Sequence, residues 1–402
     1  MTVLFLTPRL PFPLDTGTNF RNYRLIQAAA TEQRVHLLSF LDRPATKDDL
    51  RAMDALCERV ELVAAPRHSK LGRLRRAFSS SVPDLVWRRW SPPFADTLSQ
   101  MVRTTGYDVV DIEGLEMAAY RAMRGSARLV YGAHNVEHLL QQRVWEVDRN
   151  YPGRLPRALY SRHQARLLAR LEAEVCATAD RVTTVSAVDR DRLMALAPNA
   201  RSVVIPNTID VELFPARGAD PDIPTLVFTG TLDYRPNIDA VTWLTDEIVP
   251  AIRANHPAVR LFVVGRAPAT EIVARGQRDP SVAVTGAVKS VQPYFDRATI
   301  YVLPMRSGGG VRFKALEAMA ASLPVVSTAM GMDGVDAQAG RHYLAGDSVD
   351  TFARNVSALL DDPIRRRELA AAGRELVAAK YDWRAVASTV TGMFRELTCG
   401  AA

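Results

Sequence analysis

The chain has 402 residues, of which 48% are hydrophobic, and it carries a formal net charge of +7 with a pI near 9.5. This length suits two α/β domains of about 200 residues, each with its own hydrophobic core, and the positive charge favours anionic partners. The three cysteines, Cys57, Cys176 and Cys399, stand at unrelated spacings, which excludes a disulfide framework and a zinc site and fits a reducing cytoplasm.

Segments that target or cross a membrane are not expected. The first apolar run, residues 3–6, is too short for the apolar region of a signal peptide. No apolar run in the sequence approaches the length of a membrane-spanning helix. We therefore predict a soluble or peripheral protein.

The first half of the chain alternates short apolar segments with helical ones. Helices are predicted over stretches such as 22–30 and 48–56, between β-branched and apolar segments that predict strands. These strand segments are 2–7, 34–40, 60–64, 109–113, 129–133 and 181–186. Such alternation predicts a parallel, doubly wound sheet.

The second half repeats this pattern. Its predicted strands are 225–229, 260–264, 282–285, 300–303 and 325–327. The segment 203–210 links the halves, and Tyr381-Asp382-Trp383 opens a last amphipathic helix. The predicted domains are therefore 1–195 and 196–382, each Rossmann-like, followed by a C-terminal helix over 383–402.

The segment 302–328 carries the strongest functional signal. Gly308 to Gly310 follow a predicted strand, and a helix is expected to start near Val311, so its free N–H groups form an anion site. Arg312 and Lys314 place two cations in its first turn, where cations are normally disfavoured, which predicts a bound diphosphate. Glu317 has almost only apolar neighbours and needs partners, such as sugar hydroxyls. A simple helical ion pair between Lys314 and Glu317 is the structural alternative.

The run 304–328 resembles the donor-site motif of GT-B retaining glycosyltransferases, in particular glycosyltransferase family four (group 1). It is most similar to a subset with Gly-Gly-x-Arg-x-Lys-x-Leu-Glu-Ala, common among capsule and exopolysaccharide sugar transferases. The family usually has two glutamates, and Glu317 matches the second, whereas the first is replaced by Gly309. The resemblance implies a GT-B fold, with two Rossmann-like domains facing across a cleft and the last helix returning to the N-terminal domain.

The resemblance also implies donor-binding residues in the second domain. The family has an Arg and a Lys in the segment after Gly230, and this chain has Thr231 and Pro236 there. Arg235 is adjacent, so we expect it to compensate together with the two cations of the glycine loop. Backbone groups around Val288 are expected to contact the nucleotide base.

A loop of the first domain is expected to approach the donor phosphate. Gly17 and Thr18 match the family's glycine loop after the first strand, although the usual double glycine is reduced to one. An ordinary proline-rich turn is the alternative. Arg21 is a candidate contact for phosphate or acceptor, or else a solvated helix residue.

Polar residues follow two further strands of the first domain, at the edge where open α/β sheets bind ligands. His134 matches the family histidine near the transferring sugar, where it would bind a sugar hydroxyl or stabilise the reacting centre. Asn135 is a weaker candidate for the acceptor site. Asp111 and Glu113 end a strand, and either one could orient the acceptor hydroxyl or be structural.

Two basic stretches, 67–90 and 154–170, interleave cations with apolar residues. Such patches bind anionic lipid headgroups, although a solvated helix face is the alternative. Nucleic acid is not an expected partner, because no recognised nucleic-acid module accompanies the charge.

These observations predict a cytoplasmic hexosyltransferase, either soluble or peripheral on the inner face of the plasma membrane. It would transfer a sugar from a UDP- or GDP-linked donor to a glycan, lipid-linked or small-molecule acceptor, with retention. His134, Arg312 and Lys314 are the predicted catalytic residues. No cofactor and no metal are expected, because no Asp-x-Asp motif stands at a strand end. The alternatives are a non-catalytic GT-B scaffold that binds nucleotide, and a nucleotide-sugar epimerase.

Overall fold

The computed structural model describes residues 1–68, 80–308 and 313–399. The predicted donor-loop residues Gly309, Gly310, Val311 and Arg312, and much of the first basic stretch, lie outside these ranges. The chain forms two compact units. Unit 1 comprises Met1–Thr208 together with the chain from Val386 onward, and unit 2 comprises Ile209–Ala385. The domain boundaries expected from the sequence, after residues 195 and 382, stay a prediction.

Unit 1 contains a seven-stranded parallel sheet in the order β3-β2-β1-β4-β5-β6-β7. Its strands are β1 (Thr2–Thr7), β2 (Arg34–Leu41), β3 (Arg59–Ala64), β4 (Val109–Glu113), β5 (Arg128–Ala133), β6 (Arg181–Thr184) and β7 (Ser202–Val204). Its helices are α1 (Gly17–Ala29), α2 (Lys47–Asp54), α4 (Asp84–Trp87), α5 (Pro92–Thr104), α6 (Glu137–Asp148), α7 (Leu155–Thr178) and α8 (Ala187–Met194), with 3-10 helices over Leu115–Met123 and Pro152–Arg154.

Alternate residues of the buried strands supply two cores, one on each face of the sheet. On β1, Val3 and Phe5 pack with α1, α2 and α16 (Trp383–Cys399), whereas Leu4 and Leu6 pack with α5, α7 and α8. The ring of Phe394 on α16 meets the ring of Phe5 edge to face at 6.0 Å between centroids. The end of the chain is therefore part of the first core.

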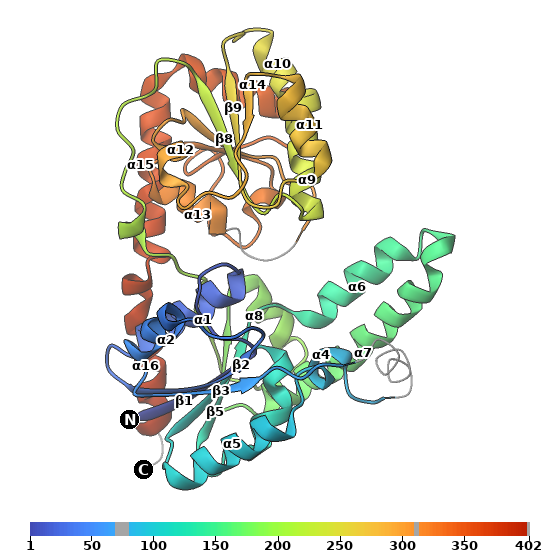
Figure 1. Ribbon diagram of the computed structural model, residues 1–402, viewed down its shortest axis with the longest axis vertical. Coiled ribbons are helices and arrows are strands. Elements are labelled where there is room, and N and C mark those ends of the chain that lie inside the picture. The colour runs from blue at the N-terminus through green and yellow to red at the C-terminus, as the bar shows by residue number, and fades with distance from the viewer. Residues whose placement is uncertain (69–79, 309–312, 400–402) are drawn as a thin grey trace. The chain divides into compact units, whose positions relative to one another are not determined.

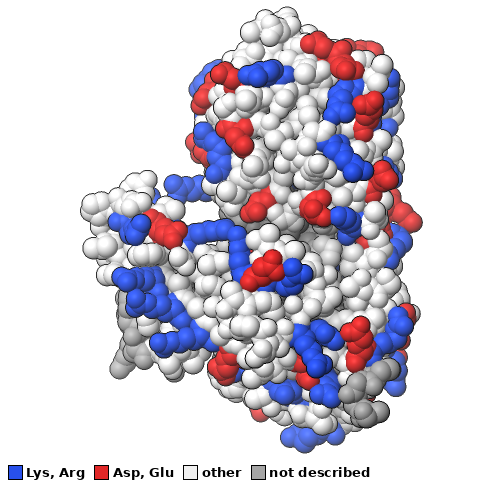
Figure 2. Space-filling model, turned by 180° about the vertical axis from the view of Figure 1, so that it is seen from behind, with Lys and Arg blue, Asp and Glu red and all other residues white. Residues whose placement is uncertain are grey.

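Helices α6 and α7 form a hairpin that projects from the body of unit 1 (Figure 1). Figure 2 shows Lys and Arg side chains gathered on this projecting lobe. None of the helices within the described ranges combines the length and hydrophobicity needed to cross a bilayer.

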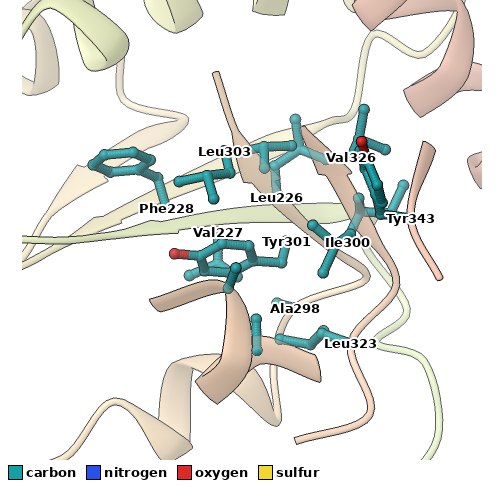
Figure 3. Close-up of a cluster of buried hydrophobic side chains, with 14 of the residues drawn as sticks. Leu226, Val227, Phe228, Ala298, Ile300, Tyr301, Leu303, Leu323, Val326 and Tyr343 are labelled. Carbon is teal, nitrogen blue, oxygen red and sulfur yellow. The ribbon is translucent and has the colours of Figure 1, made fainter. Parts of the chain in front are cut away.

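Unit 2 contains a six-stranded parallel sheet in the order β10-β9-β8-β11-β12-β13. Its strands are β8 (Thr225–Thr229), β9 (Arg260–Val264), β10 (Val282–Val284), β11 (Ile300–Leu303), β12 (Val325–Ser327) and β13 (Leu344–Ala345). Its helices are α9 (Arg235–Trp243), α10 (Val249–Arg253), α11 (Thr270–Arg278), α12 (Gln292–Phe295), α13 (Phe313–Ala320), α14 (Val349–Asp361) and α15 (Pro363–Lys380), with a π-helical turn over Leu244–Ile248 and 3-10 helices over Val211–Leu213 and Met330–Met332. Side chains of β8, β11 and β12 interleave in its core (Figure 3).

The predicted fold class, α/β with two Rossmann-like domains, is confirmed, since both sheets are parallel and share the strand order 3-2-1-4-5-6. Three details differ from the sequence prediction. The expected linker contributes strand β7, which pairs with β6, and β13 was not predicted. Helix α1 begins at Gly17 and not at residue 22, because the side chain of Thr16 caps it by accepting a hydrogen bond from the N–H of Asn19.

Candidate functional site

Each sheet has a topological switch point, where the strand order reverses and ligands of open α/β sheets bind at the carboxyl ends of the strands. In unit 1 it lies between β1 and β4, and in unit 2 between β8 and β11. The predicted site residues fall into two groups, one at each switch point. Each group is described within its own unit.

In unit 1, the structure joins two predicted residues directly. His134 follows β5, Glu113 ends the neighbouring strand β4, and His134 Nε2 lies 2.6 Å from Glu113 Oε2. The Glu113 side chain is fully buried, and that of His134 is 11% exposed. Gly132 makes the contact feasible, because a Cβ atom at that position would lie 2.1 Å from Glu113 Oε1. A carboxylate can only accept, so His134 Nε2 is the donor.

Arg21 of α1 lies close to the same carboxylate oxygen. Its Nε lies 3.8 Å from Glu113 Oε2. Its Nη1 donates to the carbonyl of Ile205 at 2.9 Å and to Asn207 Oδ1 at 3.3 Å, and its Nη2 donates to Thr183 Oγ1 at 3.4 Å. The sequence allows two roles for Arg21, contact with a ligand or a solvated position on the helix. Here its side chain is buried and bonded within unit 1.

Two buried carboxyl groups stand side by side on β4 and differ in ionisation. Burial, reinforced by the charge of Glu113, raises the pKa of Asp111 well above its ordinary value. Burial also acts to raise the pKa of Glu113, but the hydrogen bond from His134 and the charges of His134 and Arg21 outweigh it and lower that pKa. Of the two groups, Glu113 is thus the one that ionises more readily, and Asp111 the one that holds its proton more strongly.

Gly17 and Thr18 form the first turn of α1, directly after the loop that follows β1. Their position brings helix-terminal N–H groups, and not a wide glycine loop, to the switch point of unit 1. Thr16 and Asn19 shape this turn through the cap described above, and Asn19 also donates to Asp15 Oδ1 at 3.1 Å.

Asn135 lies between His134 and the start of α6, where it donates to Glu137 Oε1 at 3.2 Å. A residue that the sequence analysis missed fixes this helix start. The buried carboxylate of Glu172, on α7, accepts from the N–H of Glu137 at 2.7 Å and from His138 Nδ1 at 2.6 Å. Its partners lie 34 and 35 residues away in the sequence, so no local pattern signals it.

In unit 2, Lys314 of α13 lies at the switch point. Its Nζ donates to Asn237 Oδ1 at 2.8 Å and sits 4.6 Å from the centroid of the Phe228 ring. Asn237 is held in turn, because its Nδ2 donates to the carbonyl of Thr231 at 2.8 Å. A Cβ atom on Gly230 would lie 2.9 Å from Lys314 Nζ. The glycine thus leaves room for the ammonium group just beyond the end of β8.

Glu317 lies one helical turn after Lys314 and is partly buried. Burial raises its pKa to about 7, against the opposing charge of Lys314. A carboxyl group this costly to ionise needs hydrogen-bond donors, and sugar hydroxyls are donors of the required kind. Tyr301 lies in the same buried environment as Glu317. Burial raises the pKa of Tyr301, and the charge of Glu317 adds to the effect.

The remaining predicted donor residues are dispersed in unit 2. Arg235 is exposed at the first residue of α9, Val288 packs partly buried after β10, and Gly308 has a φ of 108° at the end of the described loop. Asn237 was missed as a Lys314 partner, although it stands in the same segment as Arg235. Among the residues that the structure describes, no group of three or more His, Cys, Asp or Glu side chains could hold a metal ion.

Two doubly wound parallel domains are the architecture of GT-B proteins, and solved structures agree. Sucrose-phosphate synthase from Thermosynechococcus elongatus superimposes with a TM-score of 0.72 at 18% identity over 100% of both chains. Anabaena Alr3699/HepE, in complex with UDP and glucose, superimposes with a TM-score of 0.66 at 14% identity, again over 100% of both chains. These likenesses concern the fold.

Family models cover most of the chain. The Glycosyltransferase Family 4 model matches residues 17–213, and the model for Glycosyl transferases group 1 matches residues 223–362. The chain belongs to this family of glycosyltransferases, as the motif around Glu317 indicated.

Curated relatives match over part of their length. A GDP-mannose-dependent alpha-(1-6)-phosphatidylinositol monomannoside mannosyltransferase of Mycobacterium tuberculosis (strain ATCC 25618 / H37Rv) is 30% identical over 241 residues, which are 54% of this chain and 62% of the relative. An uncharacterized 44.6 kDa protein in the cps region of Klebsiella pneumoniae is 23% identical over 173 residues, 41% of this chain and 44% of that protein. The chain thus spans about three fifths of the length of the mycobacterial relative.

Proposed function

We propose that this protein is a retaining hexosyltransferase that transfers a sugar from a nucleoside diphosphate to a glycan, lipid-linked or small-molecule acceptor. The observation that carries the proposal is the placement of Lys314. A cation in the first described turn of α13, beside Gly230 and held by Asn237 at 2.8 Å, faces the carboxyl ends of β8 and β11. A diphosphate is the ligand that best suits a preorganised charge at a helix start.

The chemistry that we propose is electrostatic. As the glycosidic bond breaks, the leaving diphosphate gains negative charge, and Lys314 is positioned to stabilise it together with Arg235 and the predicted Arg312. The acceptor oxygen forms its bond to the sugar carbon on the face that the diphosphate leaves, and the acceptor proton passes to a phosphate oxygen. In this proposal the fixed cations stabilise the charge of the diphosphate in place of a divalent metal, so no metal or cofactor is required.

Glu317 is assigned to the ribose of the donor. Its carboxylate would accept hydrogen bonds from two sugar hydroxyls, which replace the water lost on burial. Contacts of Gly17 and Thr18 with the donor phosphate, and of backbone groups near Val288 with the base, stay predictions.

His134 is assigned to the transferred sugar. Because its Nε2 donates to Glu113 at 2.6 Å, the ring is held in place and Nδ1 remains to bind a sugar hydroxyl. We assign Glu113 and Arg21 to the positioning of this ring, since their side chains are 0% and 4% exposed. Contacts of Arg21, Asp111, Glu113 and Asn135 with the acceptor stay predictions.

The names of similar proteins support a nucleotide-sugar donor and leave its base open. The mycobacterial relative is described as GDP-mannose-dependent, and the HepE structure contains UDP and glucose. We propose that the protein works in the cytoplasm, at the inner face of the plasma membrane.

A ligand screen tests the proposal. At 100 times its dissociation constant a ligand stabilises the protein by about 2.7 kcal/mol, so UDP, GDP or one of their sugars should raise the melting temperature. The same nucleotide sugar should then be consumed only when an acceptor is present. Turnover of the sugar without acceptor would indicate an epimerase, and binding without any turnover would indicate a scaffold. The absence of any nucleotide-dependent shift would contradict the proposal.

A further inference from the structure

Apart from the contacts between α6 and α7, the distal part of this hairpin packs little against the rest of unit 1. In α6 only Asp148 is buried, whereas the buried apolar residues of α7 are concentrated in its second half, at Leu167, Leu168, Val175 and Cys176. The distal part of the hairpin, residues 144–162, therefore projects as the lobe seen in Figures 1 and 2. We call this segment the hairpin tip.

The hairpin tip exposes large apolar side chains at an unusual density. Val144, Val147, Tyr151, Leu155 and Leu159 are between 45% and 57% exposed. They are five of the fourteen strongly exposed large apolar residues in the described part of the chain. A soluble surface normally scatters such residues singly. Their concentration marks a surface that is covered in the working protein.

Arginines continue the same face of α7 toward the body of unit 1. Leu155, Leu159, Arg162, Arg166 and Arg170 are all exposed, and their spacing of three or four residues places them along one side of the helix. No Asp or Glu occurs between residues 149 and 171. The face is thus apolar at its distal end and purely cationic behind it.

Aromatic rings of the hairpin tip carry further cations. Arg149 and Arg162 lie 4.8 and 5.4 Å from the centroid of the Trp145 ring, and Arg154 lies 4.8 Å from that of Tyr151. The acidic Asp148 is buried and paired with Arg154 at 3.3 Å. Amphipathic rings beside arginines suit the boundary between lipid headgroups and acyl chains.

We propose that the hairpin tip is the membrane-docking element of this protein and that its ligand is an anionic bilayer surface. The order of the residues supports a bilayer over other partners. Leu155 and Arg162 are seven residues apart, about 10 Å along a helix, which matches the depth to which interfacial apolar side chains enter below the headgroup phosphates. The leucines would enter below the phosphates and Arg162 would meet them, while Arg166 and Arg170 would follow on the aqueous side, where they add to the attraction of the anionic surface.

This inference rests on the proposed location at the plasma membrane and names the surface of the protein that would bind there. Its test requires neither donor nor acceptor. Binding of the full chain to vesicles of phosphatidylcholine, with and without phosphatidylglycerol, would be measured by sedimentation at low and high salt. Sugar transfer to a soluble acceptor, measured in parallel, reports on the proposed transferase activity alone. Failure of one can therefore be told from failure of the other.

Two double variants separate the apolar and cationic contributions. Arg162→Gln with Arg166→Gln should weaken binding to anionic vesicles about 30-fold, or roughly fivefold per arginine. Leu155→Ser with Leu159→Ser should weaken it on the order of tenfold. The matched controls are Ile364→Ser, at an apolar residue that is 63% exposed in unit 2, and Arg367→Gln, at an exposed arginine of the same unit. Both should bind vesicles like the parent chain.

Equal binding to neutral and anionic vesicles, or unchanged binding in both double variants, would overturn the proposal. A second copy of the chain is the rival occupant of this surface. If the leucine variant halves the molar mass in sedimentation equilibrium and leaves vesicle binding intact, the hairpin tip is a dimer contact and the proposal is wrong. Since all four substituted residues are exposed, unchanged melting temperatures should show that the variants fold.

Discussion

Replacement of His134 by alanine distinguishes a catalytic role of this residue from a purely structural one. The substitution removes a hydrogen bond of 2.6 Å to a fully buried carboxylate. A hydrogen bond to a charged group contributes about 1.5–3 kcal/mol, so the melting temperature should fall by about 3–12 °C for a domain of this size. If the ring also contacts the transferred sugar, the turnover number should fall on the order of a hundredfold or more.

The assay for His134→Ala pairs steady-state kinetics on the folded fraction with calorimetry of nucleoside diphosphate binding. Because the nucleotide-binding residues proposed above lie mostly in unit 2, the affinity for free nucleoside diphosphate should change little. His36→Ala is a matched control, since His36 is also nearly buried and its Nδ1 lies 2.8 Å from the Tyr107 hydroxyl. It should lower stability and spare turnover. Equal effects of the two substitutions on turnover per folded molecule would refute the catalytic assignment of His134.

Three further predictions concern charge, metal and packing. Burial raises the pKa of Glu317 from 4.5 to about 7, so its contribution to stability is full below pH 4.5 and is lost as pH rises through about 7. That loss, on the order of 2–3 kcal/mol, should disappear from urea titrations of Glu317→Gln, and an unchanged pH dependence would count against the burial argument. Transfer should survive excess EDTA, because fixed cations are proposed to stabilise the diphosphate; inhibition that magnesium or manganese reverses would overturn that part. Phe394→Ala should destabilise unit 1 by about 3–5 kcal/mol, since Phe394 is fully buried against Phe5, and a loss under 1 kcal/mol would show that the last helix does not belong to this core.

Strand positions were predictable because each buried strand is a short β-branched or apolar run. Six strands were predicted with the bounds that the structure gives, among them Thr2–Thr7 and Val109–Glu113. Strand Ser202–Val204 was missed because its three residues, which lie just before Ile205-Pro206, carry too little pattern. The start of α1 was missed because the capping role of Thr16 depends on the chain turning there.

The chemistry of the site was predictable only in part. Arg312 and Lys314 stand out in the sequence because cations are disfavoured at the start of a helix, and Glu317 stands out because its neighbours are almost all apolar. The partnership of Glu113 with His134 could not be predicted, since it requires β4 and β5 to be neighbours and Gly132 to leave space beside the carboxylate. Likewise, Asn237 and Lys314 are 77 residues apart and meet only through the order of the strands. The exposed apolar residues of the hairpin tip were not separable from core residues by spacing alone.

Lys314→Ala offers the most direct test of the central claim, that this site stabilises a departing diphosphate. The ammonium group lies 2.8 Å from Asn237 Oδ1 at the switch point of unit 2, and its loss should lower the turnover number on the order of a hundredfold or more in a protein that still folds. Lys380→Ala is the matched control, because Lys380 forms an exposed ion pair with Asp336 in the same unit. Turnover near that of the parent chain in Lys380→Ala, with the hundredfold loss confined to Lys314→Ala, is the predicted result. Near-parental turnover in Lys314→Ala would contradict the claim.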